Sequence, residues 1–495
     1  MNRNYVTRRE FMKVAGTAAA GLALSCRGAR SSEAASGDER PSILFVIADD
    51  WSYPHAGVYG DKVVKTPHFD RVAREGVLFT NSYCAAPTCT ASRGGVVTGQ
   101  AIHRLDEGAN LYGALPGRLK VYPDILEAAG YTVGLTGKGW GPGPLEGSGR
   151  TRNPAGPNFK DFGVFLSQAP KDKPFCFWFG SHFPHRNYEP GCGVKSGMRL
   201  KDVDVPPFLP DTPEVRGDIL DYYHEVQQFD KQVGAVLDTL EASGRAENTI
   251  VAVTSDNGMP FPRSKATLYD IGTHMPLAIR WPAKVKGGRK VDEVVSHTDF
   301  APTFLEAAGI KPLPEMTGRS MLDLLHGQQG AHRDAVFVER ERHANVRKDN
   351  LGYPARAVCM KNFIYIRNFH PERWPAGDPE MWVSVGPFGD IDTGPSKKLL
   401  LDRRDDPRIK PFFDLATGKR PAEELYDISK DPWTLRNVAN EPEYASMRQK
   451  LAHRLDTWMA KTDDPRASDP NDDRWDKYPY AGTIGEWVFP KPASK

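Results

Sequence analysis

Three carboxylates and one amide stand where they could bind a metal ion together. Asp49 and Asp50 directly follow one apolar run of the chain, and Asp256 and Asn257 directly follow another. Oxygen ligands of this kind suit a hard divalent cation, calcium or magnesium rather than zinc. Each pair taken alone is also explained by a turn or a helix cap, where Asp and Asn are common. The two pairs together favour a metal site.

Four basic side chains could surround an anion held on such a metal. Lys138 and His185 each follow a further apolar run, and Arg93 and Lys265 complete the set. Their positive charges would hold the anion, and a histidine could also donate a proton to a leaving group. A lone Lys or Arg is usually a solvated surface charge, so no member of the set identifies a site by itself.

Cys89 has two interpretations that the residues alone leave open. Residues from Thr90 onward are predicted to begin a helix, whose first backbone N–H groups would favour an anion or a nucleophile at position 89. The alternative is a small buried thiol that only fills space in the core.

The elements that must position these side chains follow the pattern of an α/β protein. Continuous apolar runs predict buried strands, and helical apolar stripes lie between them. The predicted strands cover residues 42–47, 132–135, 175–179 and 249–253. Helices are expected at 123–129, before Gly130, and at 218–243, before Gly244. Ligands of α/β sheets bind outside the carboxyl ends of the strands, which is where the polar side chains stand.

The second part of the chain has a different character. Shorter strands are predicted at 336–338, 356–358 and 363–366, followed by a polar stretch rich in Pro and Gly and then a helix at 443–459. We therefore expect a catalytic domain at 40–330 and a smaller α+β domain at 331–495, with a small antiparallel sheet and a closing helix.

The first residues have the features of an export signal. Arg8 and Arg9 precede an uncharged, Ala-rich run at 14–25 that is too short to span a bilayer. The pair of arginines indicates the twin-arginine (Tat) export machinery, with residues 1–35 as the signal. The mature protein is then periplasmic or extracellular, and an imperfect lipoprotein-type site at Cys26 would allow a lipid anchor.

Charge and cysteine content narrow the class of protein further. The formal net charge of the 495 residues is +2, with acids and bases mixed along the chain, whereas a nucleic-acid binder would carry a basic patch. We expect no nucleic-acid partner. The six cysteines show neither a paired zinc pattern nor a disulfide framework, although an exported protein could form one bridge.

The chain resembles the sulfatase family of the alkaline-phosphatase-like superfamily. The resemblance rests on Cys89-Thr90-Ala91-Ser92-Arg93, Ala48-Asp49-Asp50, Thr136-Gly137-Lys138-Gly139, Thr254-Ser255-Asp256-Asn257-Gly258 and Glu424-Leu425-Tyr426-Asp427. It implies a large mixed sheet sandwiched by helices. It also implies that a maturation enzyme, either the formylglycine-generating enzyme or the anaerobic sulfatase-maturating enzyme, oxidises Cys89 to formylglycine. Its hydrated aldehyde would attack sulfur and then expel sulfate as the aldehyde reforms.

Within this family the chain is most similar to the heparan N-sulfatases (sulfamidases). The similarity lies in Pro184-His185-Arg186, Asp256-Asn257-Gly258-Met259-Pro260-Phe261-Pro262 and Tyr353-Pro354-Ala355-Arg356-Ala357-Val358. The implied substrate is N-sulfoglucosamine in heparan-type saccharides. The alternatives are an O-sulfatase acting on another sulfated polysaccharide, a phosphonate monoester or phosphodiester hydrolase, and an inactive carbohydrate-binding relative.

The resemblance also assigns roles to individual residues. One calcium ion would be bound by Asp49, Asp50, Asp256, Asn257 and the formylglycine at position 89. Arg93 would hold the formylglycine hydrate and the sulfate, and Lys138 and Lys265 would grip the sulfate oxygens. His185 would protonate the leaving group. His274 is a further candidate for substrate binding.

One position departs from the family pattern. The family commonly has a histidine two residues after the lysine, where this chain has Trp140. His103 and His274 are candidates to replace it, and a structural role explains each equally well. The 341–343 segment aligns roughly with the sulfamidases and could touch the sugar, the alternative being a solvated run of charges.

Overall fold

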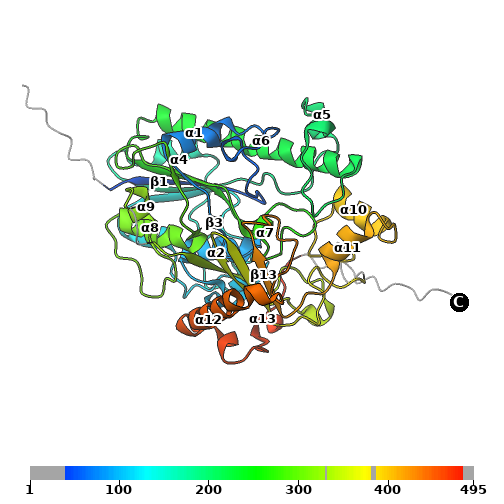
Figure 1. Ribbon diagram of the computed structural model, residues 1–495. Helices are drawn as coiled ribbons and strands as arrows, with labels where there is room; N and C mark the ends of the chain where they lie inside the picture. The colour runs from blue at the N-terminus through cyan, green and yellow to red at the C-terminus, as the bar shows by residue number, and fades with distance from the viewer. Residues whose placement is uncertain (1–39, 329–331, 381–385, 483–495) are drawn as a thin grey trace, which may run out of the picture. The chain divides into compact units, whose positions relative to one another are not determined.

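The computed structural model describes residues 40–328, 332–380 and 386–482 (Figure 1). The predicted export signal and Cys26 lie outside these ranges. Within them all five cysteines are unbridged: Cys84, Cys89, Cys176, Cys192 and Cys359. None of the helices in the described ranges combines the length and the apolar character needed to cross a bilayer.

The larger sheet has seven strands in the order β4-β5-β1-β6-β7-β2-β8. Its strands are β1 (Ser42–Ala48), β2 (Val77–Phe79), β4 (Thr132–Gly137), β5 (Phe175–Gly180), β6 (Thr249–Ser255), β7 (Leu277–Arg280) and β8 (Arg289–Val291). The neighbours β4, β5, β1 and β6 are parallel, while β7 runs antiparallel to β6 and to β2. The four predicted strands are confirmed, and the sheet is mixed. A two-stranded sheet pairs β3 (Ser82–Tyr83) with β9 (Val295–Ser296).

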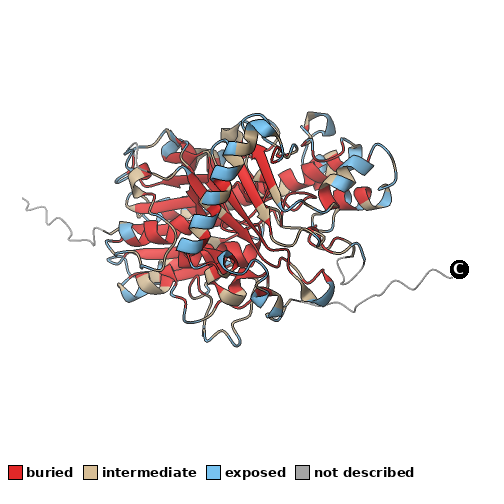
Figure 2. Cartoon of the chain, turned by 60° about the horizontal axis from the view of Figure 1, so that its bottom comes forward, coloured by how far each residue is buried: buried red, intermediate tan, exposed pale blue. Residues whose placement is uncertain are grey.

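Helices cover both faces of this sheet. Alternate side chains of β1 enter two separate cores, Ile43 and Phe45 on one face and Leu44 and Val46 on the other, so the strand is apolar throughout. Figure 2 shows the buried strands in red beneath helices whose outer faces are exposed. The first core includes α2 (Cys89–Thr98), α3 (Tyr122–Ala128), α8 (Phe300–Ala307) and α9 (Leu322–Leu325); the second includes α1 (Pro67–Glu75), α4 (Phe162–Gln168) and α6 (Pro213–Ala242).

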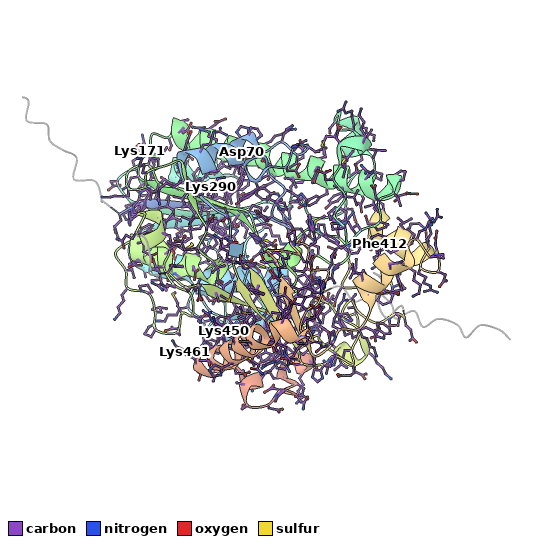
Figure 3. The ribbon with its side chains drawn as sticks, viewed as in Figure 1. Asp70, Lys171, Lys290, Phe412, Lys450 and Lys461 are labelled. Atoms are coloured by element: carbon purple, nitrogen blue, oxygen red, sulfur yellow. The ribbon has the colours of Figure 1, made fainter. Side chains whose placement is uncertain are left out.

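The later part of the chain forms a four-stranded antiparallel sheet in the order β10-β11-β12-β13. Its strands are β10 (Ala335–Arg340), β11 (Ala355–Met360), β12 (Phe363–Asn368) and β13 (Glu423–Asp427). Helix α12 (Ala445–Lys461) packs Leu451 and Leu455 against one face, and its Lys450 and Lys461 lie on the outside (Figure 3). The other face packs against Tyr83 and Tyr269.

The predicted strands and closing helix of this region are confirmed, but the polar stretch between them is not all irregular. It contains α10 (Pro395–Asp402) and α11 (Lys410–Thr417), which the sequence did not predict. Both are short and begin with a proline in the first turn, so they show little of the long apolar periodicity that identifies α6. The remaining helices are α5 (Cys192–Lys195), α7 (Asp270–Thr273) and α13 (Arg474–Lys477).

Candidate active site

The carboxyl ends of two adjacent parallel strands bring the predicted acidic residues together. Asp49 and Asp50 follow β1 and Asp256 follows β6, while Cys89 enters from the first turn of α2. One ligand atom from each of these four residues lies within 4.8 Å of the others, and all four residues are buried. The strand-end argument made from the sequence therefore holds for this cluster.

Asn257 completes the cluster and carries an acceptor that the protein leaves open. Its Nδ2 donates to Asp50 Oδ1 at 2.7 Å, and its backbone N–H donates to Asp256 Oδ1 at 2.8 Å. Its Oδ1 is buried and meets no hydrogen-bond donor in the described part of the chain. A buried, unpaired amide oxygen costs free energy unless a ligand satisfies it. Together with three carboxylates, it forms a donor set that fits a hard divalent cation.

Arg93 lies on α2 and joins that helix to the strand ends. Its Nε donates to Asp256 Oδ2 at 2.8 Å, and its Nη2 lies 3.9 Å from Asp49 Oδ1. Its Nη1 donates to the carbonyl oxygens of Lys138 and Gly139 at 2.8 and 2.9 Å. The guanidinium has no exposed surface, so Arg93 is fully enclosed by this set of partners.

Two lysines balance the remaining negative charge. Lys138, at the end of β4, places Nζ 2.6 Å from both carboxylate oxygens of Asp49. Lys265 places Nζ 2.8 Å from Asp50 Oδ2. The three carboxylates thus face three cations in a buried site, an arrangement that can accept both a metal ion and an anion bound to it.

Burial and these charges shift the pKa values in opposite directions. Burial raises the pKa of Asp50 to about 6, although Lys265 acts against it. Burial also acts to raise the pKa of Asp49, but the charges of Lys138 and the other cations of the site together outweigh it and hold that pKa well below its ordinary value. Burial raises the pKa of the Cys89 thiol well above its usual range. An unmodified Cys89 is therefore a neutral thiol and a poor nucleophile.

Cys89 is the first residue of α2, one position before the predicted helix start at Thr90. Its Sγ lies 3.5 Å from Asp49 Oδ1, and Thr88 before it has the extended backbone of a helix N-cap. The side chain at position 89 is therefore aimed at the acidic cluster from a helix N-terminus.

His185 follows β5 and is the more accessible member of the site. Its Nε2 lies 3.9 Å from Asp50 Oδ2, and its side chain is 39% exposed. Its Nδ1 donates a hydrogen bond to the carbonyl of Arg186, which leaves Nε2 to face the site. In the imidazolium form, that Nε2 would carry a proton towards a bound ligand.

Two predicted histidines are held elsewhere. His274 Nδ1 bonds to Asp270 Oδ2 at 3.0 Å, and its ring stacks on Tyr53 at 4.0 Å between centroids. His103 Nδ1 bonds to Glu339 Oε2 at 2.7 Å in a separate buried cluster with Asp464. Both side chains have protein partners, and these partners are not members of the acidic cluster.

Trp140 fills core volume at the position where the family has a histidine. It is buried in the core on the α2 face of the large sheet, and its backbone N–H donates to Asn153 Oδ1 at 3.0 Å. His182, the second residue after β5, lies close enough for the charges of Asp49 and Lys138 to act on its pKa, which burial lowers. From the sequence, His182 is one of the polar residues that follow this strand, together with His185 and Arg186, but no role was assigned to it.

The 341–343 segment is buried, so the interpretation of a solvated charge run is wrong. Glu341 forms an ion pair with Arg466 at 3.0 Å, and Arg342 donates to main-chain carbonyls near Trp475. His343 Nδ1 lies 2.7 Å from Thr88 Oγ1, directly before Cys89. These charges were misread because their partners come from distant segments.

Asp392 is a site residue that the sequence reasoning missed. Its Oδ2 lies 3.1 Å from Lys265 Nζ, the same atom that bonds to Asp50. The contact spans 127 positions of the chain and no motif marks it.

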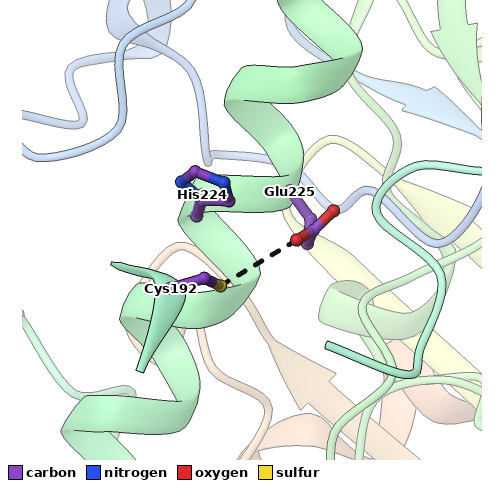
Figure 4. A group of neighbouring side chains, drawn as sticks. All are labelled: Cys192, His224 and Glu225. Atoms are coloured by element: carbon purple, nitrogen blue, oxygen red, sulfur yellow. Dashed lines mark hydrogen bonds between the residues drawn. The ribbon is translucent and has the colours of Figure 1, made fainter. Parts of the chain in front are cut away.

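A second group of metal-ligating side chains lies apart from the strand ends. Cys192 on α5 faces His224 and Glu225 on α6, with Cys192 Sγ 3.9 Å from Glu225 Oε1 (Figure 4). Burial raises the pKa of Cys192 to about 12, helped by Asp221 and Glu225, so the thiol keeps its proton. The thiol already donates to Glu225 and to the Asp221 carbonyl, so it is held by protein partners.

The fold is of α/β type and the acidic cluster could hold a metal ion, and family comparison is more specific. The family model described as "Sulfatase" matches residues 41–142 and 157–310, and the chain belongs to this family. A second model, "N-sulphoglucosamine sulphohydrolase, C-terminal", matches residues 263–374. The protein is therefore a sulfatase, an enzyme that hydrolyses sulfate esters or sulfamates.

Individual relatives agree with this assignment. An ulvan-active sulfatase from Formosa agariphila is 29% identical over 476 residues, covering 86% of this chain and 76% of the relative. The human N-sulphoglucosamine sulphohydrolase is 29% identical over 480 residues, covering 87% of this chain and 92% of the human protein. Among solved structures, BT4656 in complex with its substrate D-glucosamine-2-N,6-O-disulfate has a TM-score of 0.64 at 19% identity, covering 87% of this chain and 99% of that one, which is a likeness of fold.

Proposed function

We propose that this protein is a calcium- and formylglycine-dependent sulfatase that removes the N-sulfo group from glucosamine in heparan-type saccharides. The observation that carries the proposal is the buried cluster of Asp49, Asp50, Asp256 and Asn257 around Cys89, flanked by Lys138 and Lys265.

The donor set fits a hard divalent cation, and the family resemblance implies that this cation is calcium. Asp49, Asp50, Asp256 and the open Oδ1 of Asn257 would hold it, and the bound ion would polarise the oxygens of a sulfate. Lys138 and Lys265 would then be free to turn from their carboxylates towards the anion. We propose that they bind the sulfate oxygens, as the family resemblance implies.

Residue 89 supplies the nucleophile once a maturation enzyme has oxidised Cys89 to formylglycine. That residue offers a hydrated aldehyde as nucleophile, which a buried neutral thiol cannot match. Asp49 and the N-terminus of α2 orient the side chain, and Arg93 fixes α2 against β6 through Asp256. In this structure, therefore, Arg93 supports the site as well as adding positive charge to it.

His185 is proposed to protonate the leaving group. Its Nε2 faces the cluster from the exposed side, where the sugar would lie, and its Nδ1 is tied to the Arg186 carbonyl. An amine or alkoxide leaving group needs this proton because neither is stable as an anion in water.

The choice of an N-sulfo group rests on the C-terminal family match, on Pro184-His185-Arg186 and on the segment from Met259 to Pro262. The test is sulfate release by the matured, calcium-loaded enzyme from N-, 2-O-, 4-O- and 6-O-sulfated saccharides. Release from N-sulfoglucosamine first and fastest is expected. Release from 6-O- but not N-sulfated glucosamine would overturn the N-sulfatase assignment while leaving the sulfatase chemistry intact.

An O-sulfatase is the second candidate, because the ulvan-active sulfatase is as similar in sequence as the human N-sulphoglucosamine sulphohydrolase. Activity on sulfated ulvan fragments would favour it. We further propose export through the Tat machinery, which a reporter fused to residues 1–35 would test.

A further inference from the structure

Asp392 presents a carboxylate to the mouth of the site. It lies in the loop between β12 and α10, and its side chain is 25% exposed, whereas Asp49, Asp50 and Asp256 are at most 2% exposed. Among the described residues, Lys265 is the one donor bonded to Asp392, and it uses Oδ2. The other oxygen, Oδ1, is left for a ligand.

The loop on each side of Asp392 is firmly anchored. Asp390 accepts hydrogen bonds from Arg340 and Arg347 at 2.7 and 2.6 Å, and all three side chains are buried. Ser396 donates from Oγ to Asp218 Oδ2 at 2.7 Å. Two buried charge clusters thus hold the backbone around Asp392, so its carboxylate is positioned before any ligand arrives.

The same anchor holds the loop that carries His185. Asp218 accepts two hydrogen bonds from Arg186, at 2.7 and 2.9 Å, in addition to the two from the backbone N–H and the Oγ of Ser396. Gly394 packs so closely on Arg186 that an added Cβ would lie 2.5 Å from its Nη1. Asp392 and His185 are therefore fixed relative to one another, on the side of the site that faces the leaving group.

We infer that Asp392 determines which sugar the site accepts. This inference rests on the proposed function, in which a sulfated sugar is the substrate. In it, Asp392 accepts a hydrogen bond from the free hydroxyl on the carbon next to the reacting sulfate. It also excludes a second sulfate at that carbon. A hydroxyl can donate to Oδ1, whereas a sulfate offers no proton and brings a negative charge against a carboxylate in a poorly solvated site.

A purely supporting role for Asp392 would produce different behaviour. If it only held Lys265 in place, its loss would weaken every substrate alike, because Lys265 would bind the same sulfate in each. A direct contact instead changes the ratio between substrates that differ at one carbon. The ratio of kcat/KM between two such substrates, rather than kcat/KM for one substrate, therefore separates a direct contact from a supporting role.

The experiment takes the best substrate from the sulfate-release panel in three forms. The neighbouring carbon carries a hydroxyl, a hydrogen or a second sulfate. For the wild type, we expect kcat/KM to fall about ten- to a hundredfold for the deoxy form, the size of a hydrogen bond to a charged acceptor, and further for the doubly sulfated form. Asp392→Asn should relieve the penalty of the second sulfate at least about tenfold, and Asp392→Ala should abolish the preference for hydroxyl over hydrogen.

Asp405→Asn is the matched control, because it removes the same charge from a side chain that is 98% exposed. Asp405→Asn should leave kcat/KM unchanged for all three forms of the substrate. Binding of the three sugars to the calcium-loaded full chain with unmodified Cys89, measured by calorimetry, gives the same ratios without turnover. This binding measurement still tests the role of Asp392 if the sulfate-release assay shows no N-sulfatase activity. Such a negative assay would count against the proposed function alone. Equal or undetectable affinity of the wild type for all three sugars, or a uniform loss in Asp392→Asn, overturns the inference.

Discussion

Arg93 Nε donates to Asp256 Oδ2 at 2.8 Å, and neither side chain has any exposed surface. This buried pair joins the first turns of α2 to the carboxyl end of β6. It therefore fixes the position of residue 89 relative to the acidic cluster. Truncating one partner of such a pair lowers the free energy of unfolding by much more than the intact pair contributes to it, because the other charge stays buried and unpaired.

Removal of Arg93 should therefore damage both stability and activity. Arg93→Ala is expected to lower the free energy of unfolding by about 3–5 kcal/mol and to lower kcat/KM at least about a hundredfold. Chemical denaturation and sulfate release measure the two effects. Arg436→Ala is the control, since Arg436 is 72% exposed in its ion pair with Glu441 and should cost less than about 1 kcal/mol. An equal effect of the two substitutions would contradict the role given to the Arg93–Asp256 pair.

Calcium should be needed for activity and should stabilise the fold. A chelator is expected to abolish sulfate release and calcium to restore it, and calcium at about 100 times its Kd should add about 2.7 kcal/mol to the free energy of unfolding. Asn257→Ala removes the open Oδ1 and should raise the calcium concentration needed at least about tenfold. The exposed Asn471→Ala should change nothing. Calcium titrations followed by thermal unfolding provide the measurement.

The role of His185 can be tested through the leaving group. His185→Ala should lower kcat/KM on a sugar sulfate or sulfamate by about 10²–10⁴-fold, because the departing group loses its proton donor. On 4-nitrophenyl sulfate the loss should be much smaller, since nitrophenolate leaves without a proton. His453, exposed on α12, is the control position. A similar loss on both substrates would show that His185 does not act as the acid.

Stability should depend on pH through His103. Burial acts to lower the pKa of His103, but Glu339 outweighs it and the pKa stands above its ordinary value of 6.5. A raised pKa means that the folded state holds the proton more tightly than the unfolded chain. The stabilising contribution is therefore complete below about pH 6.5 and is lost as the pH rises through the folded-state pKa.

Comparison of the wild type with His103→Gln isolates this contribution. The difference in the free energy of unfolding should be largest at pH 5.5–6.5 and should shrink by up to about 1.4 kcal/mol per pH unit above that range. Urea denaturation from pH 5.5 to 9 measures it. A difference that grew with rising pH would show that the His103–Glu339 pair is not ionised as described.

Much of the fold and of the acidic cluster could be predicted from local sequence. A buried parallel strand is a short apolar run, and the polar residues that follow it lie at the edge of the sheet where ligands bind. Asp49, Asp50, Asp256 and Asn257 were found in this way. Position 89 was placed at a helix start by the same kind of local signal, while its oxidation was inferred from family resemblance alone.

The tertiary structure decided which charged side chains meet. Lys265 and Asp392 are 127 positions apart, and Thr88 and His343 are 255 apart, so no periodicity or cap motif relates them. The 341–343 segment looked like a solvated run of charges because its partners, Arg466 and Thr88 among them, are distant in the chain. Strands and helix ends follow from interactions between near neighbours, whereas ion pairs across a fold exist only after the layers have packed. That is why the sequence determined the candidate metal ligands, and packing alone placed Asp392 beside them.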